Sequence, residues 1–411
     1  MITNLREAYS TPEKKMDSFM ETMKDEYAFG VNDADREIAR QNRLLVKIHG
    51  AKEAMRLAEA MWKPGGMKKI RQNYLEAERS GKLSEALAVT AFPAQLRLGV
   101  QDLISRKFVT VPTVGDKVRM SVPSNAFIQP YAGTFRLGVP SRVGIGEEFP
   151  EANVQGFGQL VENWKFGEII SFQEELIEYD QTGQLQQKVS DLGVNMANYE
   201  EIAFAAVLQD TTVTNGGYTF TPNTYTDPDT TTGVYQSSGN RTNRPVTFGA
   251  ISVGTLKFAK QTLLLMKQPD GQFVNINPNC VVYHPVDEQY VTIIGKSPTF
   301  PGTPQSNTAF GAPVGYPAQG VVNPIQGMYT YYECRYLNSN TATNGGAWFV
   351  TEAGAPHVTW QELSGLRTVA EAPNSGPGFS RMLKRWRTDK IGAMFMYEGG
   401  ARFLFEGNNG A

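Results

Sequence analysis

The most regular hydrophobic pattern of the chain lies between residues 185 and 206. An average repeat of about 3.5 residues keeps side chains on one face of a helix over several turns. The spacing therefore predicts one long amphipathic helix that begins after Asp180 and ends near Gln209. Because only three heptads are present and strand-like segments flank them, a helix laid across a sheet is favoured over a coiled coil. The apolar positions follow at alternating intervals of four and three residues: Leu185, Val189, Leu192, Met196, Tyr199, Ala203 and Ala206.

A different pattern precedes this helix. Residues 106–165 are rich in β-branched and aromatic side chains and are interrupted by Pro and Gly, which predicts strands joined by long turns, with Phe108–Pro112 as one strand. The segment has few apolar clusters large enough for a core of its own. We therefore expect a projecting hairpin that packs against another part of the molecule.

Helix and strand patterns alternate after residue 245. A second helix is predicted from about Phe248 to Lys267, followed by a turn and a short buried strand at Cys280–His284, which together indicate a compact α/β unit. Residues 211–243 and 299–320 are rich in small and turn-forming side chains and are predicted to be loops or insertions. The fold class is α+β. Further strands are expected at 328–336, 347–351 and 390–405.

Residues 12–88 are predicted to form a separate, highly charged region of two or three helices. Thr11 and Pro12 fit the N-cap and first position of the first helix. Eleven basic and four acidic residues lie between Arg40 and Lys82, a local charge of +7 in a chain whose net charge is −2. A solvated helix face and a nonspecific phosphate-binding surface both explain this run. A smaller basic group occurs near the C-terminus at Arg381, Lys384, Arg385, Arg387 and Lys390.

Composition narrows the class of protein. Charged residues make up only 19% of the chain against 41% hydrophobic ones, which indicates a globular protein with much buried or interfacial surface. Only two cysteines occur, so a disulfide framework is not expected. No apolar run approaches the roughly 20 residues of a membrane helix, and the first fifteen residues lack the apolar block of a secretory signal. Neither a membrane span nor export is expected.

Signs of catalysis are scarce. Cys280, His284 and Cys334 could in principle ligate a metal, but a fourth ligand is missing and buried thiols are the favoured interpretation. The adjacent pairs Glu147-Glu148 and Glu174-Glu175 would point to opposite faces of a strand. No nucleophile-elbow, phosphate-loop or zinc-protease motif is present. We therefore expect no enzyme activity, no cofactor and no metal.

The order of these elements resembles the major capsid proteins of tailed double-stranded DNA phages, with the Hong Kong-97-type fold, in the branch of Mu-like head subunits. Residues Trp164–Asp180 resemble the strand that leads into the spine helix of that family, and Leu185–Leu208 resemble the spine helix itself. Gln261–Pro285 is similar to the opening of the axial domain. Three further segments resemble the closing strands of that family: Trp348–Val350, Leu363–Gly365 and Lys390–Tyr397. The resemblance covers about Phe92 to Phe405.

The resemblance implies a shell protein that self-assembles as hexamers and pentamers into an icosahedral head around double-stranded DNA. It also implies a virion location after assembly in the host cytoplasm, scaffold and portal partners, and in some relatives a decoration protein. An encapsulin-like compartment and an unrecognised hydrolase are the alternatives. The implied division of the chain is an N-terminal helical arm 1–91, an extended hairpin (E-loop) with lead-in strands 92–180, a peripheral domain with the spine helix 181–245, an axial domain 246–325 and closing strands 326–411.

Two groups of residues are candidates for contacts in such a shell. On the hairpin, Arg136, Arg142, Glu147 and Glu148 are candidates for ion pairs between subunits. Some relatives form a covalent bond from a hairpin lysine, but no Lys occurs between Lys117 and Lys165, so no such bond is expected here. In the arm, the candidates for nonspecific contact with packaged DNA are Arg40, Arg43, Lys47, Lys52, Lys68, Lys69 and Arg71.

Overall fold

The computed structural model describes most of the chain after residue 84. The described residues are 85–134, 156–173, 184–222 apart from 216, 251–267, 273–298, 323–340, 345–370, 383–396 and 400–407, with a few residues between 56 and 76 and at 234–235 and 243–244. They divide into two compact units, which we describe separately. The first unit draws on Met1–Pro112, Trp164–Asn198 and Glu362–Gly392. The second draws on Thr113–Asn163, Tyr199–Gln361 and Ala393–Ala411.

Two long helices dominate the first unit. α9 runs from Gln184 to Gln209, which confirms the helix that the heptad pattern predicts. α6 runs from Glu85 to Thr110, so the expected strand at Phe108–Pro112 is wrong, because most of that segment continues a helix. The reason is tertiary packing: Leu96, Val100 and Ile104 follow a helical stripe that is buried, and this burial outweighs the β-propensity of the residues around Phe108. α6 also continues across residue 92, where the sequence analysis placed the boundary between the arm and the hairpin region. The five-part division of the chain stays a prediction.

A four-stranded sheet has the order β1-β12-β13-β4. β4 (Trp164–Gln173) pairs antiparallel with β13 (Leu383–Met396), from Leu383 opposite Gln173 to Gly392 opposite Trp164. β12 (Val358–Ala370) and β13 each continue from one unit into the other, and β1 spans Met120–Pro123.

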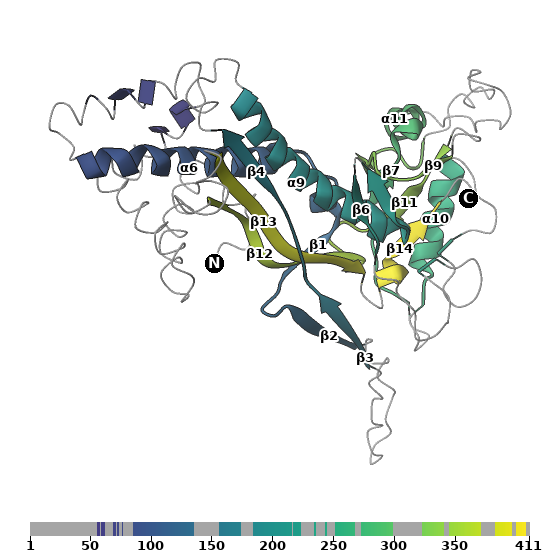
Figure 1. Ribbon diagram of the computed structural model, residues 1–411. Coiled ribbons are helices and arrows are strands. Elements are labelled where there is room, and N and C mark those ends of the chain that lie inside the picture. Colours follow the sequence, from purple (N-terminus) through teal and green to yellow (C-terminus); the bar gives the residue numbers. More distant parts are fainter. Residues whose placement is uncertain are drawn as a thin grey trace, which may run out of the picture. The chain divides into compact units, whose positions relative to one another are not determined.

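The core of the first unit lies between α6, α9 and one face of this sheet (Figure 1). Leu103 and Ile104 of α6 and Val189 of α9 pack with Phe172 and Trp386, whose rings lie 5.7 Å apart. The described arm residues Met61 and Ile70 are helical and buried in the same cluster. Part of the arm therefore contributes to this core; the rest of residues 1–84 lies largely outside the described residues.

The predicted hairpin is confirmed in the second unit. β2 (Ile128–Thr134) pairs antiparallel with β3 (Gly156–Glu162) over seven rows, from Ile128 opposite Glu162 to Thr134 opposite Gly156. The short helix α7 (Gly115–Val118) and β1 precede it in the chain. Another two-stranded ladder, β5 (Val213–Asn215) with β6 (Tyr218–Phe220), lies at the start of the predicted loop 211–243.

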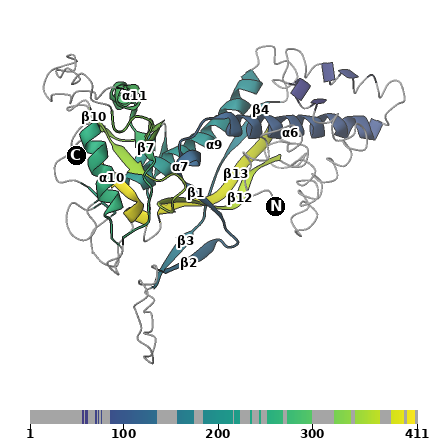
Figure 2. The ribbon, with the colours of Figure 1, turned by 180° about the vertical axis from the view of Figure 1, so that it is seen from behind.

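The predicted compact α/β part of the second unit is also confirmed. Its sheet has the order β14-β11-β7-β8, with β7–β8 parallel and the other pairs antiparallel. The helices lie beside this sheet in both ribbon views (Figure 2). The α+β class is confirmed. The bounds are α10 Val253–Leu264, β7 Cys280–Tyr283, α11 Glu288–Lys296, β8 Thr330–Glu333, β11 Trp348–Thr351 and β14 Leu404–Glu406.

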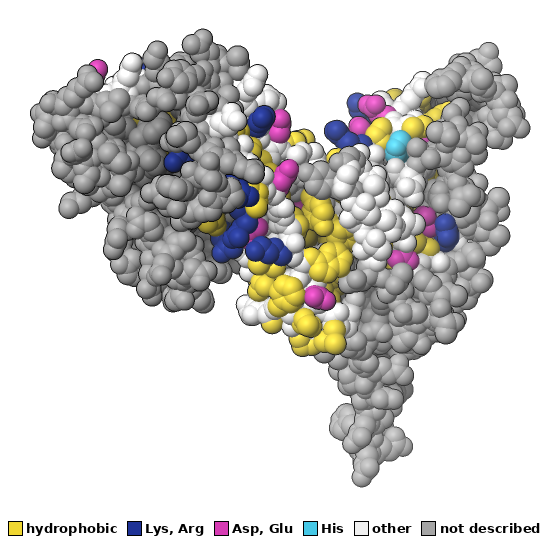
Figure 3. Space-filling view, in the orientation of Figure 1, with side chains coloured by type: hydrophobic (Ala, Val, Ile, Leu, Met, Phe, Trp, Pro, Cys, Tyr) yellow, Lys and Arg dark blue, Asp and Glu magenta, His cyan; other side chains and the backbone are white. Residues whose placement is uncertain are grey.

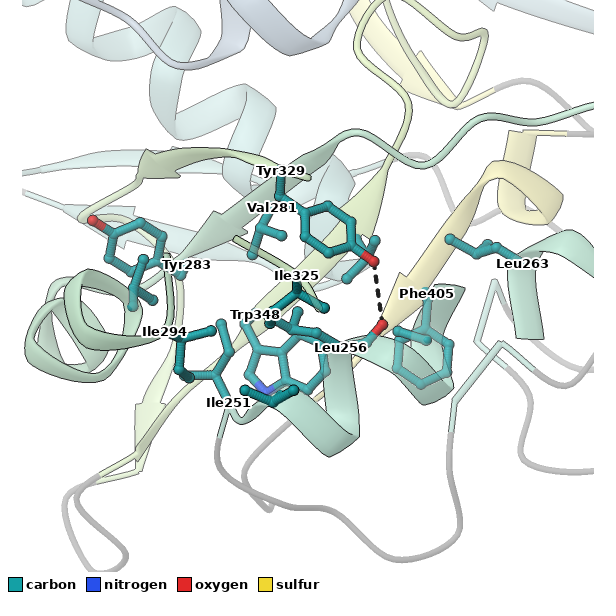
Figure 4. Packing of buried hydrophobic residues seen from close by; sticks show 14 of the residues in the cluster. Ile251, Leu256, Leu263, Val281, Tyr283, Ile294, Ile325, Tyr329, Trp348 and Phe405 are labelled. Atoms are coloured by element: carbon teal, nitrogen blue, oxygen red, sulfur yellow. Dashed lines mark hydrogen bonds between the residues drawn. The ribbon is translucent and has the colours of Figure 1, made fainter. Parts of the chain in front are cut away.

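Aromatic and aliphatic side chains fill the space between this sheet and α10 (Figure 4). Trp348 and Phe405 are almost fully buried, and their rings lie 6.0 Å apart. The hydroxyl of Tyr329 donates a hydrogen bond of 3.2 Å to the carbonyl of Leu256, so its polar end is satisfied within the core. Ser252 and Thr255 form a capping box that fixes where α10 begins.

Candidate subunit-contact surfaces

The β2–β3 hairpin has two unlike faces. On one face, Val161 is fully buried against Ala393 and Phe395, and the ring of Tyr131 lies 5.2 Å from that of Phe395. Gln159 donates a hydrogen bond of 3.2 Å from its side-chain amide to the carbonyl of Met396. The hairpin thus buries this face by packing against the end of β13, as expected of a segment with few apolar clusters of its own.

The other face of the hairpin is apolar and exposed. Ile128 is 54% and Leu160 is 73% exposed, and Pro130 lies opposite Leu160 on the same face. Glu162, opposite Ile128, adds a carboxylate at its edge. Phe127, just before β2, is 50% exposed. Figure 3 shows hydrophobic side chains gathered in the region of the hairpin. Contiguous exposed apolar side chains of this kind mark interaction surfaces.

Three buried polar side chains anchor the base of the hairpin. Ser124 Oγ accepts hydrogen bonds from Asn163 Nδ2 at 3.0 Å and from Gln361 Nε2 at 3.2 Å, and it donates to the carbonyl of Ala126 at 2.9 Å. Asn163 Nδ2 also donates to Ala126 O at 2.8 Å. Asn163 and Gln361 are fully buried. Because buried polar groups are costly unless bonded, this network fixes the chain on both sides of the hairpin.

The segment that leads into the hairpin is held by two consecutive glutamates of α9. Arg119 donates to Glu200 Oε2 at 2.8 Å, and its guanidinium lies 5.0 Å from the centre of the Trp360 ring. Glu201 accepts the backbone N–H groups of Val114 at 3.1 Å and Gly115 at 3.0 Å. Burial raises the pKa of Glu201, although these N–H groups, Arg119 and the Cys334 thiol all oppose the rise. Burial lowers the pKa of Arg119, but the charges of Glu200 and Asp116 outweigh it, so the net shift is upward.

Two more carboxylates of the second unit are buried. Burial raises the pKa of Asp287 to about 6, partly offset by the N–H of Gly346 at 3.0 Å. Burial likewise raises the pKa of Glu406 to about 7, although Arg244 lies 3.0 Å away and opposes the shift. Since a raised folded-state pKa favours folding only while the group is protonated, both contributions are lost as pH rises through these values.

The α10 side of the second unit carries a further exposed apolar group. Phe258 is 50%, Leu265 is 65% and Phe273 is 58% exposed. Lys267 lies over the ring of Phe273 at 5.7 Å. These three side chains are exposed in addition to the apolar face of the hairpin.

The three residues considered as metal ligands have other contacts in the structure. Cys280 is buried in β7, and burial raises the pKa of its thiol to about 12. Cys334 is also buried as a free thiol and hydrogen-bonds Glu201. His284 Nδ1 accepts the N–H of Val286 at 3.1 Å. Over the part of the chain that the structure describes, no group of three or more His, Cys, Asp or Glu side chains is placed to hold a metal ion.

Most of the residues singled out in the sequence lie outside the described residues. This holds for the hairpin candidates Arg136, Arg142, Glu147 and Glu148, and for the arm candidates other than Lys69. Lys69 is helical and exposed. The structure adds surfaces that sequence reasoning missed, chiefly the exposed face with Ile128 and Leu160. The pairing register of β2 with β3 reveals it, whereas the alternation of apolar residues does not show which face is covered.

A family model described as "Phage capsid protein" matches residues 165–398, more than half of the chain. The chain belongs to this family of capsid proteins. The predicted role of a phage major capsid protein that forms the head shell is thereby confirmed, and its role is structural. The same match supports a phage shell over the encapsulin-like alternative. Among the described helices, none is long and apolar enough to cross a membrane.

Solved capsid structures show a distant likeness to this capsid protein. The capsid of a native GTA particle is 11% identical, with 70% of this chain and 87% of the other covered and a TM-score of 0.42. The capsid of cyanophage P-SCSP1u is 11% identical, with coverages of 72% and 87% and a TM-score of 0.42. A protein from Mycobacterium phage Bobi is 12% identical, with coverages of 72% and 89% and a TM-score of 0.43. No curated protein sequence matches the chain.

Proposed function

We propose that copies of this capsid protein tile as hexamers and pentamers into an icosahedral shell around the double-stranded DNA of a tailed phage. The observation that carries the proposal is the hairpin, which buries one face on its own unit and leaves Ile128 and Leu160 exposed on the other. In a family of shell proteins, such a face is explained by burial against a neighbouring copy. Assembly in the host cytoplasm with scaffold and portal proteins, and decoration of the outer surface, belong to the same proposal.

The hairpin face is the first target for a test. Leu160→Asp places a charge at the most exposed apolar position, and burying an unpaired carboxylate at an interface costs several kcal/mol. We expect particle yield to fall at least tenfold while the circular dichroism of the unassembled chain is unchanged. Sedimentation and electron microscopy of expressed protein measure the yield. Thr219→Asp, at an exposed position of β6, is the matched control and should assemble normally. Normal particles from Leu160→Asp would remove the hairpin face from the proposal.

The ion-pair candidates of the hairpin remain part of the proposal. Arg136 and Arg142 carry cations and Glu147 and Glu148 carry carboxylates within one stretch of sequence. We propose that these charges align neighbouring copies, giving specificity more than affinity, because exposed ion pairs each contribute only about 0–1 kcal/mol. The covalent bond of some relatives needs a lysine in the hairpin, and this stretch of sequence contains none.

The basic arm is proposed to contact the packaged DNA. A variant in which seven basic residues of the arm are replaced with Gln should have less DNA in purified particles, because seven positive charges are removed, without reduced particle yield. The residues replaced are Arg40, Arg43, Lys47, Lys52, Lys68, Lys69 and Arg71. Each lost phosphate contact should also flatten the salt dependence of DNA binding by about 0.9 in log–log slope. Absorbance ratios and a salt titration measure both quantities. Loss of particles with unchanged DNA per particle would instead assign the arm to contacts between capsomers.

A further inference from the structure

His357 is a buried histidine with no hydrogen bond to its ring. It lies in the turn just before β12 and is 0% exposed. Neither Nδ1 nor Nε2 has a hydrogen-bond partner among the residues that the structure describes. A neutral imidazole carries one N–H donor and one acceptor, so both polar atoms are buried without compensation. A protonated imidazole would bury two donors and a full charge at the same place.

The backbone on both sides of His357 is tied to other elements. The N–H of Gly354 donates to the carbonyl of the last residue of α7 at 2.9 Å. The short helix η2 (Gly400–Phe403) lies directly against the turn, because a Cβ at Gly400 would come within 2.8 Å of the Pro356 carbonyl oxygen and 2.9 Å of that of His357. Hydrating the imidazole therefore requires the turn to separate from η2.

The charges around His357 do not favour its protonated form. Burial lowers the pKa of the imidazole from 6.5 to about 4, and of the neighbouring groups only the carbonyl of Ala355 opposes the shift. The charged side chains of the adjoining elements have other partners. Arg402 of η2 donates to the carbonyl of Lys267, Glu352 accepts the N–H of Asn277 at 3.0 Å, Glu362 lies 3.0 Å from Lys390 Nζ, and Asp116 of α7 pairs with Arg119.

Two more uncompensated side chains follow at a spacing of two residues. Thr359 and Gln361 are alternate residues of β12 that share one face, and both are 0% exposed. Thr359 Oγ1 and Gln361 Oε1 have no hydrogen-bond partner among the described residues. We call His357, Thr359 and Gln361 the polar row of β12. Opening the row lets all three side chains bond to water, which reduces the cost of opening.

The polar row is connected to the base of the β2–β3 hairpin. Gln361 Nε2 donates to Ser124 Oγ at 3.2 Å, and Asn163 Nδ2 donates to the same oxygen at 3.0 Å. Asn163 directly follows β3. Because β12 is one continuous strand, displacing its first residues from η2 also displaces Gln361 from Ser124. Movement at His357 therefore reaches the residues that fix the hairpin.

We propose that His357 is an acid sensor, whose protonation opens the polar row and loosens the base of the hairpin. The imidazolium requires hydration, which the closed row cannot supply and the open row can. The change is reversible, because it makes and breaks no covalent bond. It concerns the chain itself, so it holds or fails independently of the proposed shell function.

The direction of the pH effect separates His357 from the buried carboxylates of the same unit. Between about pH 6.5 and pH 4 the open form binds a proton that the closed form does not, so the closed row loses stability as pH falls. Asp287, Glu406 and Glu201 have raised pKa values, and their contributions change in the opposite direction. Loosening in acid therefore cannot come from these carboxylates.

Hydrogen exchange of the full-length chain, followed by mass spectrometry, tests the proposal. A pKa of about 4 in the closed form and 6.5 in the open form predicts roughly 50-fold more opening at pH 4.5 than at pH 7. After correction for intrinsic exchange, peptides with the first residues of β12 and with Asn163 should lose protection by this factor. The paired strands β7 and β11 should lose less than threefold. Equal loss in all of these strands would show global unfolding and contradict a local sensor.

Substitutions identify the titrating group. His357→Phe keeps an aromatic ring that cannot be protonated and should reduce the loss of protection to less than about threefold. Two controls should keep the wild-type response: Thr359→Val, which removes a neighbouring hydroxyl of the row, and His284→Asn, which retains an acceptor for the N–H of Val286. A full acid response in His357→Phe, or its disappearance in His284→Asn, would overturn the proposal.

The wild-type chain gives a measurement that needs no variant. Exchange of the imidazole C2 hydrogen, measured peptide by peptide across a pH series, reports the titration of each histidine. His357 should exchange at least tenfold more slowly than His284 at pH 8, since His284 is partly exposed, and its titration midpoint should lie below pH 5. A midpoint near 6.5, with exchange as fast as that of His284, would show a hydrated ring and overturn the proposal.

Discussion

Gly193→Val should lower the free energy of unfolding of the first unit by about 3 kcal/mol or more, because the backbone of α6 lies directly against α9 at this glycine. A Cβ there would lie 2.6 Å from the carbonyl oxygen of Ile104 and 3.2 Å from the backbone nitrogen of Phe108. Backbone atoms of a helix cannot yield as a flexible side chain can, so the two helices must separate and lose packing around Val189 and Leu192. Urea unfolding of the unassembled chain, followed by circular dichroism, measures the change.

The control is another helical glycine. Gly254 lies in α10, where a Cβ would meet only Ser252 Oγ at 3.8 Å. Gly254→Ala should therefore leave stability unchanged or raise it by up to about 1 kcal/mol, since alanine has the higher helix propensity. Gly193→Ala should fall between the two, with a destabilisation of about 1–3 kcal/mol. Equal stability of Gly193→Val and the wild type would show that the helices do not cross at this residue.

Arg119→Ala should destabilise the second unit by about 3–5 kcal/mol, because it removes the cation from a buried acidic site. Arg119 and Glu200 are 6% and 2% exposed, and Glu201 follows directly on the same helix. Without Arg119, the charge of Glu200 is left buried and uncompensated. Hydrogen exchange of the amides in the last turns of α9 and in α7, measured on the unassembled chain, reports on this unit specifically.

The loss should also depend on pH. Burial raises the pKa of Glu201 and Arg119 opposes that rise, so removing Arg119 raises the pKa of Glu201 further. A carboxyl with a raised folded-state pKa favours folding at low pH and loses that contribution as pH rises through the folded value. The defect of Arg119→Ala should therefore be larger at pH 8 than at pH 4.5. A pH-independent defect would show that lost packing on Trp360, not charge, is the cause.

Two substitutions separate charge from packing further. Arg119→Lys keeps the charge but not the planar guanidinium over Trp360, so it should cost less than Arg119→Ala and show little pH dependence. Lys117→Ala removes an exposed cation from α7, two residues before Arg119, and should cost less than about 1 kcal/mol. A cost for Lys117→Ala as large as that for Arg119→Ala would contradict the assignment to the buried pair.

The sequence by itself determined the elements whose burial is periodic: α9 from its heptad stripe, the compact α/β part from its helix and all-apolar strand at Cys280–Tyr283, and the existence of the hairpin. The order of these elements also resembles that of phage capsid proteins, and this resemblance identified the family. Periodicity reports which side of an element is buried, and neighbouring residues suffice for that.

Tertiary structure alone decided the rest, because it depends on partners far apart in the chain. The helical state of Phe108 is set by packing in the α6–α9 interface, which a local β-propensity cannot anticipate. Arg119 meets Glu200 from 81 positions away, and Asp389 gathers cations from three strands. Which hairpin face stays open likewise follows from Val161 packing against Phe395. Charge and apolarity are visible in a sequence, but whether they are compensated or covered is a property of the folded chain.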